Sequence, residues 1–247
     1  MLRAVTPAPL WRLAVRLRAR MAANRGKLSY SAHGEDLLVV SWLRHYQCDL
    51  SKVRYVDVGA NHPIFLSNTY LLYRAGARGL LIEPDPAQAA LLRARRPNDV
   101  VVCAGVAFDE RRSATLFRMT ASGFNTFSRK QAEFVIRSSQ SWEPHEQQRI
   151  VEEITVPLVP LNDVITEHLP GGAPDFISID TEGADLAILR TLDLDLINSN
   201  PNTPSFICVE ASSPFLEFLA YVQPAGFEMM ARTPDNWLFR RHPEKLY

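Results

Sequence analysis

The sequence has 247 residues, of which 47% are hydrophobic and 22% charged, and its formal net charge is zero. These values are typical of a soluble globular chain with one large core. The balanced charge gives no general electrostatic reason to bind nucleic acid. Cys48, Cys103 and Cys208 lack CxxC spacing, which argues against a zinc site or a disulfide framework and indicates a reducing, cytoplasmic setting.

Residues 1–28 form a basic segment that differs from the rest of the chain. Arginines recur every four residues at positions 12, 16 and 20, and no acidic residue precedes Glu35. Leucines at helical spacing mark a neighbouring face, so this segment is predicted to be a helical arm. One interpretation is a peripheral contact with an anionic membrane surface at the inner face of a membrane. The other is an arm packed on the domain formed by residues 29–247, with solvated arginines.

After the arm, short apolar strands alternate with helical segments. The predicted strands are 53–58, 79–82, 100–106, 175–179 and 205–209. The predicted helices are 67–75, 87–96 and 184–192. This alternation predicts parallel βαβ units with right-handed crossovers, and hence an α/β, Rossmann-like fold. Two further strands, 227–232 and 237–241, predict an antiparallel hairpin that closes the sheet at its C-terminal end.

Residues 111–160 interrupt the alternation. They contain two predicted strands, 114–119 and 154–159, with a polar loop at 120–128 and a polar helix that includes Trp142 and His145. An insertion at this point in the strand order is a natural place for a substrate-binding cap.

Side chains of the insertion suit a carbohydrate pocket. Phe124 and Trp142 offer apolar faces, while Asn125 and Thr126 offer groups that hydrogen-bond to hydroxyls. The alternative is that Phe124 and Phe127 only anchor the loop to the core. Two cations that follow, Arg129 and Lys130, could meet a phosphate on a nucleotide-linked sugar or only water.

The first motif with chemical content is VDVGAN, residues 56–61, at the end of the first strand. Ligands of open α/β sheets bind beyond the carboxyl ends of the strands, where Gly59 would allow close backbone approach. The Asp57 carboxylate could accept hydrogen bonds from a ligand amine or from bound water. A dinucleotide would require G-x-G-x-x-G at this turn. Asn61 and Pro63 stand there instead, which favours a nucleoside without phosphate.

Two more strand ends carry acids. Glu83 follows the second strand and could accept hydrogen bonds from both ribose hydroxyls, although an acid in Glu-Pro-Asp-Pro could also serve a helix cap. Asp180 and Glu182 follow the fourth strand, so their carboxylates are expected at the same edge as Asp57. The alternative is that they interact with the N-terminal dipole of the next helix, which accounts for one acid better than for two.

Four motifs together resemble the FkbM family of methyltransferases in order and spacing: YSAHGED (30–36), VDVGAN (56–61), IEP (82–84) and IDTEGAD (179–185). The resemblance covers about residues 29–241. It implies a Rossmann-like methyltransferase fold with a mostly parallel seven-stranded sheet. It also implies transfer of a methyl group from S-adenosylmethionine to a hydroxyl of a sugar, glycan or natural product.

The resemblance also implies site residues. The cofactor-binding candidates are Glu35, Asp57, Gly59, Asn61, Glu83 and Asp180. The catalytic candidates are Glu182 and Asp180, with His33 or His62 next, because a hydroxyl needs a base to become a good nucleophile. Asp180 and Glu182 could also bind a divalent metal, but two acids are too few to predict one.

The sequence departs from the family pattern after VDVGAN, where His62-Pro63-Ile64 replaces the usual residues. Asn68 and Thr69, just beyond, are candidates to contact the methionine end of the cofactor instead. The departure leaves open a methyltransferase-like scaffold without turnover, although four acids at one edge argue against it. A nicotinamide-dependent oxidoreductase is disfavoured by the missing glycines.

Overall fold

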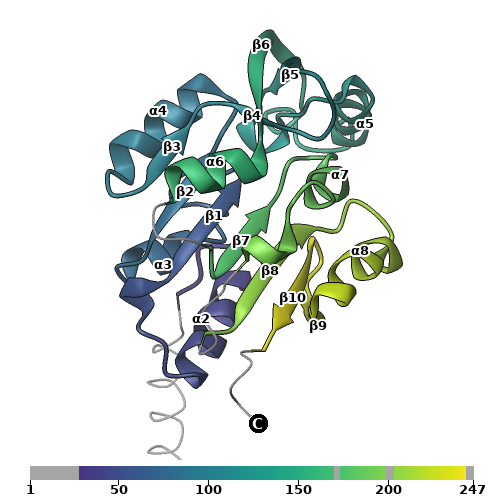
Figure 1. Cartoon of the computed structure of the whole chain (residues 1–247). Helices are drawn as coiled ribbons and strands as arrows, with labels where there is room; N and C mark the ends of the chain where they lie inside the picture. Colours follow the sequence, from purple (N-terminus) through teal and green to yellow (C-terminus); the bar gives the residue numbers. More distant parts are fainter. Residues whose placement is uncertain (1–27, 170–172, 198–202, 243–247) are drawn as a thin grey trace, which may run out of the picture.

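The computed structural model describes residues 28–169, 173–197 and 203–242 (Figure 1). The predicted arm therefore lies, apart from Leu28, outside the described residues. The centre of the molecule is a seven-stranded sheet with the order β3-β2-β1-β7-β8-β10-β9. Its strands are β1 (Arg54–Val58), β2 (Arg78–Ile82), β3 (Val100–Val102), β7 (Phe176–Ile179), β8 (Ser205–Glu210), β9 (Glu228–Arg232) and β10 (Asn236–Arg241). All pairings are parallel except those of β10, which runs antiparallel to both β8 and β9. This confirms the predicted fold class.

Helices cover both faces of the sheet, because side chains alternate between faces along each buried strand. Tyr55 of β1 packs in a cluster with side chains of three helices: α2 (Glu35–His45), α3 (Tyr70–Arg74) and α4 (Pro86–Arg95). Its neighbours Val56 and Val58 pack on the other side with three more: α6 (Leu161–His168), α7 (Asp185–Leu189) and α8 (Phe215–Val222). None of the helices in the described part of the chain is long and apolar enough to cross a bilayer.

The insertion, together with residues 105–107 just before it, forms a second, smaller sheet with the order β4-β6-β5. Its strands are β4 (Gly105–Ala107), β5 (Ser113–Met119) and β6 (Ile150–Pro160), and one helix, α5 (Arg129–Ser139), packs on it through a small core of its own. In Figure 1 this unit lies above the central sheet, at the end toward which β1 points. The predicted insertion is therefore present at the carboxyl ends of the parallel strands, and its use as a substrate cap stays a prediction.

The predicted strand 100–106 is wrong as a single element. The chain forms β3 in the central sheet and then β4 in the second sheet, with Cys103 and Ala104 between them. Gly105 explains the change of partner: a Cβ atom there would lie 2.6 Å from the Phe127 ring and 2.8 Å from the Leu158 side chain. The glycine lets β4 approach β6 more closely than any other residue would allow.

The predicted polar helix with Trp142 and His145 is also misplaced. The helix is α5, which ends at Ser139, so both residues lie in the turns that follow it. Pro144 disfavours helical geometry in the residue before it. The hydroxyl of Ser139 also accepts a hydrogen bond at 2.9 Å from the backbone N–H of Gln148, which folds the chain back toward β6.

The C-terminal hairpin is tied to α2 by Glu35, a residue expected from the resemblance to bind cofactor. The Glu35 side chain is fully buried. Its carboxylate accepts hydrogen bonds from the Thr233 hydroxyl at 2.6 Å, the Asn236 amide at 3.1 Å and the His33 backbone N–H at 2.9 Å. These contacts join segments from opposite ends of the chain, so Glu35 has a clear part in stability.

We expect Glu35→Ala to lower the free energy of unfolding by about 3 kcal/mol, because it leaves buried donors without their charged acceptor. Urea denaturation measures this change. The matched control is Glu217→Ala, which removes a half-exposed partner of Arg190 and should cost less than about 1 kcal/mol. Equal losses in the two variants would contradict the assigned role of Glu35.

Candidate active site

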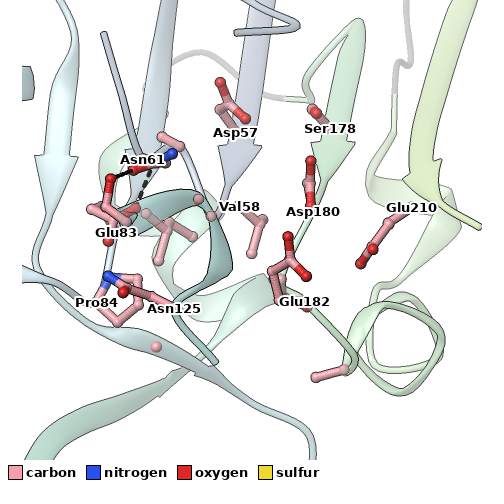
Figure 2. Close-up of a pocket in the computed structure, with 18 of the residues that line it drawn as sticks. Asp57, Val58, Asn61, Glu83, Pro84, Asn125, Ser178, Asp180, Glu182 and Glu210 are labelled. Atoms are coloured by element: carbon pink, nitrogen blue, oxygen red, sulfur yellow. Dashed lines mark hydrogen bonds between the residues drawn. The ribbon is translucent and has the colours of Figure 1, made fainter. Parts of the chain in front are cut away.

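A cavity of about 980 Å³ lies between the carboxyl ends of the central strands and the insertion. Its position follows from the strand register, since Val58 pairs with Ile82 on one side and with Ile179 on the other. The residues that follow these three in sequence therefore emerge at one level, and Figure 2 labels two of them, Glu83 and Asp180. This edge is also where the strand order reverses, between β1 and β7, the usual ligand position in such sheets.

The turn after β1 is shaped by Gly59 and Asn61, both in left-handed conformations with φ of +80° and +44°. The turn brings the Asn61 backbone N–H to 2.7 Å from one carboxylate oxygen of Glu83 (Figure 2), and the Asp85 N–H lies 2.8 Å from the other. Burial raises the pKa of Glu83 to about 7, although these two hydrogen bonds act to lower it. A buried carboxylate thus faces the cavity in a fixed orientation.

Asp57, near the end of β1, is the second buried carboxylate in the cavity wall. The Thr69 hydroxyl donates a hydrogen bond to it at 2.5 Å. Burial raises the pKa of Asp57, while the charge of Arg96 and the hydrogen bond from Thr69 oppose that rise. Of the two substitutes predicted for the missing helix contact, Asn68 lines the cavity, whereas Thr69 acts on Asp57.

Three carboxylates gather on the other side of the cavity, at the ends of β7 and β8 (Figure 2). One oxygen each from Asp180, Glu182 and Glu210 lies within 4.8 Å of the others. Burial, followed by the charge of Asp185, raises the pKa of Glu182 to about 7 and that of Asp180 well above its ordinary range. Burial likewise raises the pKa of Glu210, one of whose oxygens has no hydrogen-bond partner. We call these three residues the acidic cluster.

The acidic cluster suits a proton acceptor, and its hard oxygen atoms are also of the kind that a divalent cation prefers. Sequence reasoning found Asp180 and Glu182 but missed Glu210. The signal was present, because Glu210 directly follows the predicted fifth strand, 205–209, just as Glu83 and Asp180 follow theirs.

The loop of the insertion is fastened over the cavity by three hydrogen bonds. The Ser122 hydroxyl donates to the Asn61 side chain at 2.8 Å, and the Asn125 amide donates to Asp85 at 3.1 Å. The Thr126 hydroxyl donates to the backbone carbonyl of Glu182 at 2.8 Å. The loop therefore touches the turns after β1, β2 and β7, and it forms one wall of the cavity.

Only some of the residues expected to contact an acceptor line the cavity. Phe124 and Asn125 line the cavity, and Phe124 packs against Trp142 with ring centroids 5.8 Å apart. Trp142 itself lies in an adjoining shallow hollow with His145. Arg129 pairs with Glu153, and neither Arg129 nor Lys130 belongs to the cavity wall.

The two histidine candidates occupy different positions. His33 lies outside the cavity wall, and its Nε2 atom is 2.8 Å from a carboxylate oxygen of the exposed Asp235 at the rim. His62 lines the cavity, but its Nδ1 atom accepts hydrogen bonds from the backbone N–H groups of Ile64 and Phe65. The departure after VDVGAN is therefore a turn that His62 closes.

The carboxylates that line the cavity fit the cofactor expected from the sequence. S-adenosylmethionine carries a ribose diol, an ammonium group and a sulfonium, all of which favour carboxylate partners. Within the described residues, Arg111 is the only arginine or lysine in the cavity wall, and it pairs with Asp109 at 2.8 Å. A pyrophosphate would find little to neutralise it, which argues against a dinucleotide.

Gly59 provides a direct test of the turn. A Cβ atom there would lie 1.8 Å from the Asp180 carbonyl oxygen, whereas one on Gly34, which also has a positive φ, would meet nothing within 4 Å. We expect Gly34→Ala to cost about 1 kcal/mol of stability from backbone strain alone. Gly59→Ala should cost at least about 4 kcal/mol, because strain and a backbone clash combine. Thermal and urea unfolding measure both, and similar losses would contradict the close approach of the two turns.

Comparison with known proteins identifies the family. The model of the methyltransferase FkbM domain matches residues 57–232, whereas no curated protein matches the sequence. Solved structures with a similar trace include a TehB-like S-adenosylmethionine-dependent methyltransferase from Corynebacterium glutamicum, with 12% identity, TM-score 0.42, and coverage of 96% of this chain and 100% of that one. Another is an O-methyltransferase from Bacillus cereus in complex with S-adenosylhomocysteine, with 11% identity, TM-score 0.41, and coverage of 96% and 92%. Because the family model spans well over half of the sequence, the chain belongs to the FkbM methyltransferase domain family, and it is an S-adenosylmethionine-dependent methyltransferase.

Proposed function

We propose that the protein transfers the methyl group of S-adenosylmethionine to a hydroxyl of a sugar, glycan or natural-product acceptor, with Glu182 as the base. The observation that carries this proposal is the acidic cluster, in which Glu182 lies against Asp180 and Glu210 in the cavity wall. A hydroxyl is a poor nucleophile until its proton is removed. A carboxylate with a pKa of about 7 is well matched to that task near neutral pH.

The cofactor is placed by the two other carboxylates. Glu83 accepts the ribose hydroxyls, since its position at the end of β2 matches the acid that holds ribose in related sheets. Asp57, on the neighbouring strand, takes the ammonium group of the methionine end. Gly59, Asn61 and Asp180 complete the wall between them. Glu35 and His33 lie outside that wall, so their assignment rests on the family resemblance alone.

The chemistry requires alignment and one proton transfer. When bound, S-adenosylmethionine supplies a methyl group on a positively charged sulfur, which makes it electrophilic. Glu182 takes the hydroxyl proton as the new C–O bond forms and the C–S bond breaks. Burial, followed by the charge of Asp185, keeps the pKa of Glu182 at about 7. The neighbouring oxygen atoms of Asp180 and Glu210 suit the positive sulfonium.

The acceptor enters beneath the insertion. Phe65 and Leu66 line the cavity while 71% and 67% exposed, so they give the entrance an apolar lip. Phe124 and Asn125 also line the cavity, where a ring face and an amide can contact a sugar or polyketide hydroxyl. The exposed apolar side chains favour an acceptor with an apolar face over a fully polar one.

The cofactor assignment predicts that Asp57→Asn combined with Glu83→Gln weakens S-adenosylhomocysteine binding about 100-fold, because two charge-assisted contacts are lost. Calorimetric titration measures the affinity. Asp163→Ala with Glu167→Ala, which removes two exposed acids from α6, is the control and should bind normally. Wild-type affinity in a folded Asp57/Glu83 variant would place the cofactor elsewhere, and no binding to the intact protein would favour a scaffold.

The base assignment predicts the pH dependence of methyl transfer. Because the ionised carboxylate is the active form, kcat should rise through about pH 7, with a tenfold fall for each unit below that value. Glu182→Gln should lower kcat about 100-fold and leave the affinity for S-adenosylhomocysteine unchanged. Labelled methyl transfer to sugars, nucleotide-linked sugars and polyketides, with products identified as methyl ethers by NMR, provides the assay. A rate that is independent of pH from 5 to 9 would exclude this role.

A further inference from the structure

Arg96, the residue after α4, carries a guanidinium that the proposed chemistry does not use. Its side chain is fully buried. Its Nε atom donates to Asp99 at 2.7 Å, and one terminal nitrogen donates to the Tyr55 hydroxyl at 2.8 Å. Both terminal nitrogens lie 3.1 Å from the Thr69 hydroxyl. A buried cation with this many fixed partners is held in one orientation.

The hydrogen bonds from Arg96 continue into the cavity. A hydroxyl has one proton to donate and two lone pairs to accept with. Since the Thr69 oxygen accepts from both terminal nitrogens of Arg96, its single proton is directed to Asp57, 2.5 Å away. Arg96 itself is not part of the cavity wall, whereas Asp57 is. A chain of hydrogen bonds therefore links the buried Arg96, through the Thr69 hydroxyl, to the Asp57 carboxylate that faces the cavity.

Asp57 needs such a partner because its surroundings are mostly acidic. The titratable groups that act on it or are affected by it are Arg96, Asp99, Glu83, Asp180 and Cys208. Burial and Asp99 raise the pKa of Asp57, and Arg96 is the strongest opposing charge. Without the guanidinium, the carboxylate would more readily take up a proton and lose its attraction for a cation.

We propose that Arg96 is a positioning residue which, through Thr69, holds Asp57 as an oriented carboxylate for the ammonium group of the cofactor. This inference rests on the proposed function, in which Asp57 meets the methionine end of S-adenosylmethionine. It means that a residue at the end of α4, far along the sequence from the VDVGAN turn, contributes to cofactor affinity.

The test uses Thr69, because Arg96 variants are expected to unfold. Thr69→Val keeps the shape of the side chain and removes the hydroxyl, while Thr69→Ser restores it. Tyr55→Phe is the matched control: it removes another hydroxyl that is hydrogen-bonded to Arg96 but leaves the hydrogen bonds from Arg96 through Thr69 to Asp57 intact. Calorimetry would compare two probes, S-adenosylhomocysteine and 5′-methylthioadenosine, which lacks the amino-acid end.

We expect Thr69→Val to weaken S-adenosylhomocysteine binding by at least about tenfold and to leave 5′-methylthioadenosine binding unchanged, because only the former reaches Asp57. Thr69→Ser should restore the affinity for S-adenosylhomocysteine. Tyr55→Phe should lower the melting temperature but leave that affinity unchanged. Equal loss of both probes in Thr69→Val, or a Tyr55→Phe variant that behaves like it, would show a purely structural role and overturn the proposal.

The role of Asp57 is distinguished by a further variant. If Thr69→Val binds S-adenosylhomocysteine normally while Asp57→Asn does not, Asp57 contacts the cofactor without help from Arg96 and only the positioning inference fails. If Asp57→Asn also binds normally, the proposed cofactor placement fails, and the inference fails with it.

Discussion

The parallel pairing of β1 with its neighbours sets Val58 level with Ile82 on one side and with Ile179 on the other. The site depends on this register, because it delivers one turn from each strand to the same edge of the sheet. The turns then touch: the Asp180 carbonyl approaches Gly59 so closely that only glycine fits. A shift of one residue in any of these strands would turn its carboxylate toward a helix layer.

The carboxylates at this edge are stabilised in two different ways. Glu83 accepts backbone N–H groups, and Asp57 is held by Thr69 and Arg96, so both are oriented before any ligand arrives. The acidic cluster has no comparable cation beside it among the described residues, and burial raises the pKa of all three members. Carboxylates that are oriented in advance, such as Glu83 and Asp57, suit the cofactor, which is the same in every reaction. The acidic cluster, which has no cation beside it among the described residues, suits the place where the acceptor loses its proton and the sulfonium loses its charge.

Much of the fold could be predicted, because alternating strands and helices leave a strong pattern and strand ends with acids mark one edge. The break between β3 and β4 could not, since it goes with the close packing of Gly105 against Phe127 and Leu158, which are distant in sequence. Glu210 and Arg96 were missed for related reasons. The position of Glu210 after a predicted strand was a signal, but its meaning becomes clear only when β8 is known to lie beside β7. An arginine at the end of a helix normally faces solvent. Its burial is decided by Tyr55 and Asp99, which lie elsewhere in the sequence.

The central claim is that the strand-end turns of β1 and β2 hold the cofactor while the acidic cluster faces its methyl group. A crystal structure of the protein with S-adenosylhomocysteine tests this most directly. The account predicts both ribose hydroxyls within hydrogen-bond distance of Glu83, the amino group beside Asp57, and the sulfur facing Glu182 across the space left for the acceptor. A cofactor bound with its ribose away from Glu83, or with its sulfur on the far side of the cavity from the acidic cluster, would contradict it.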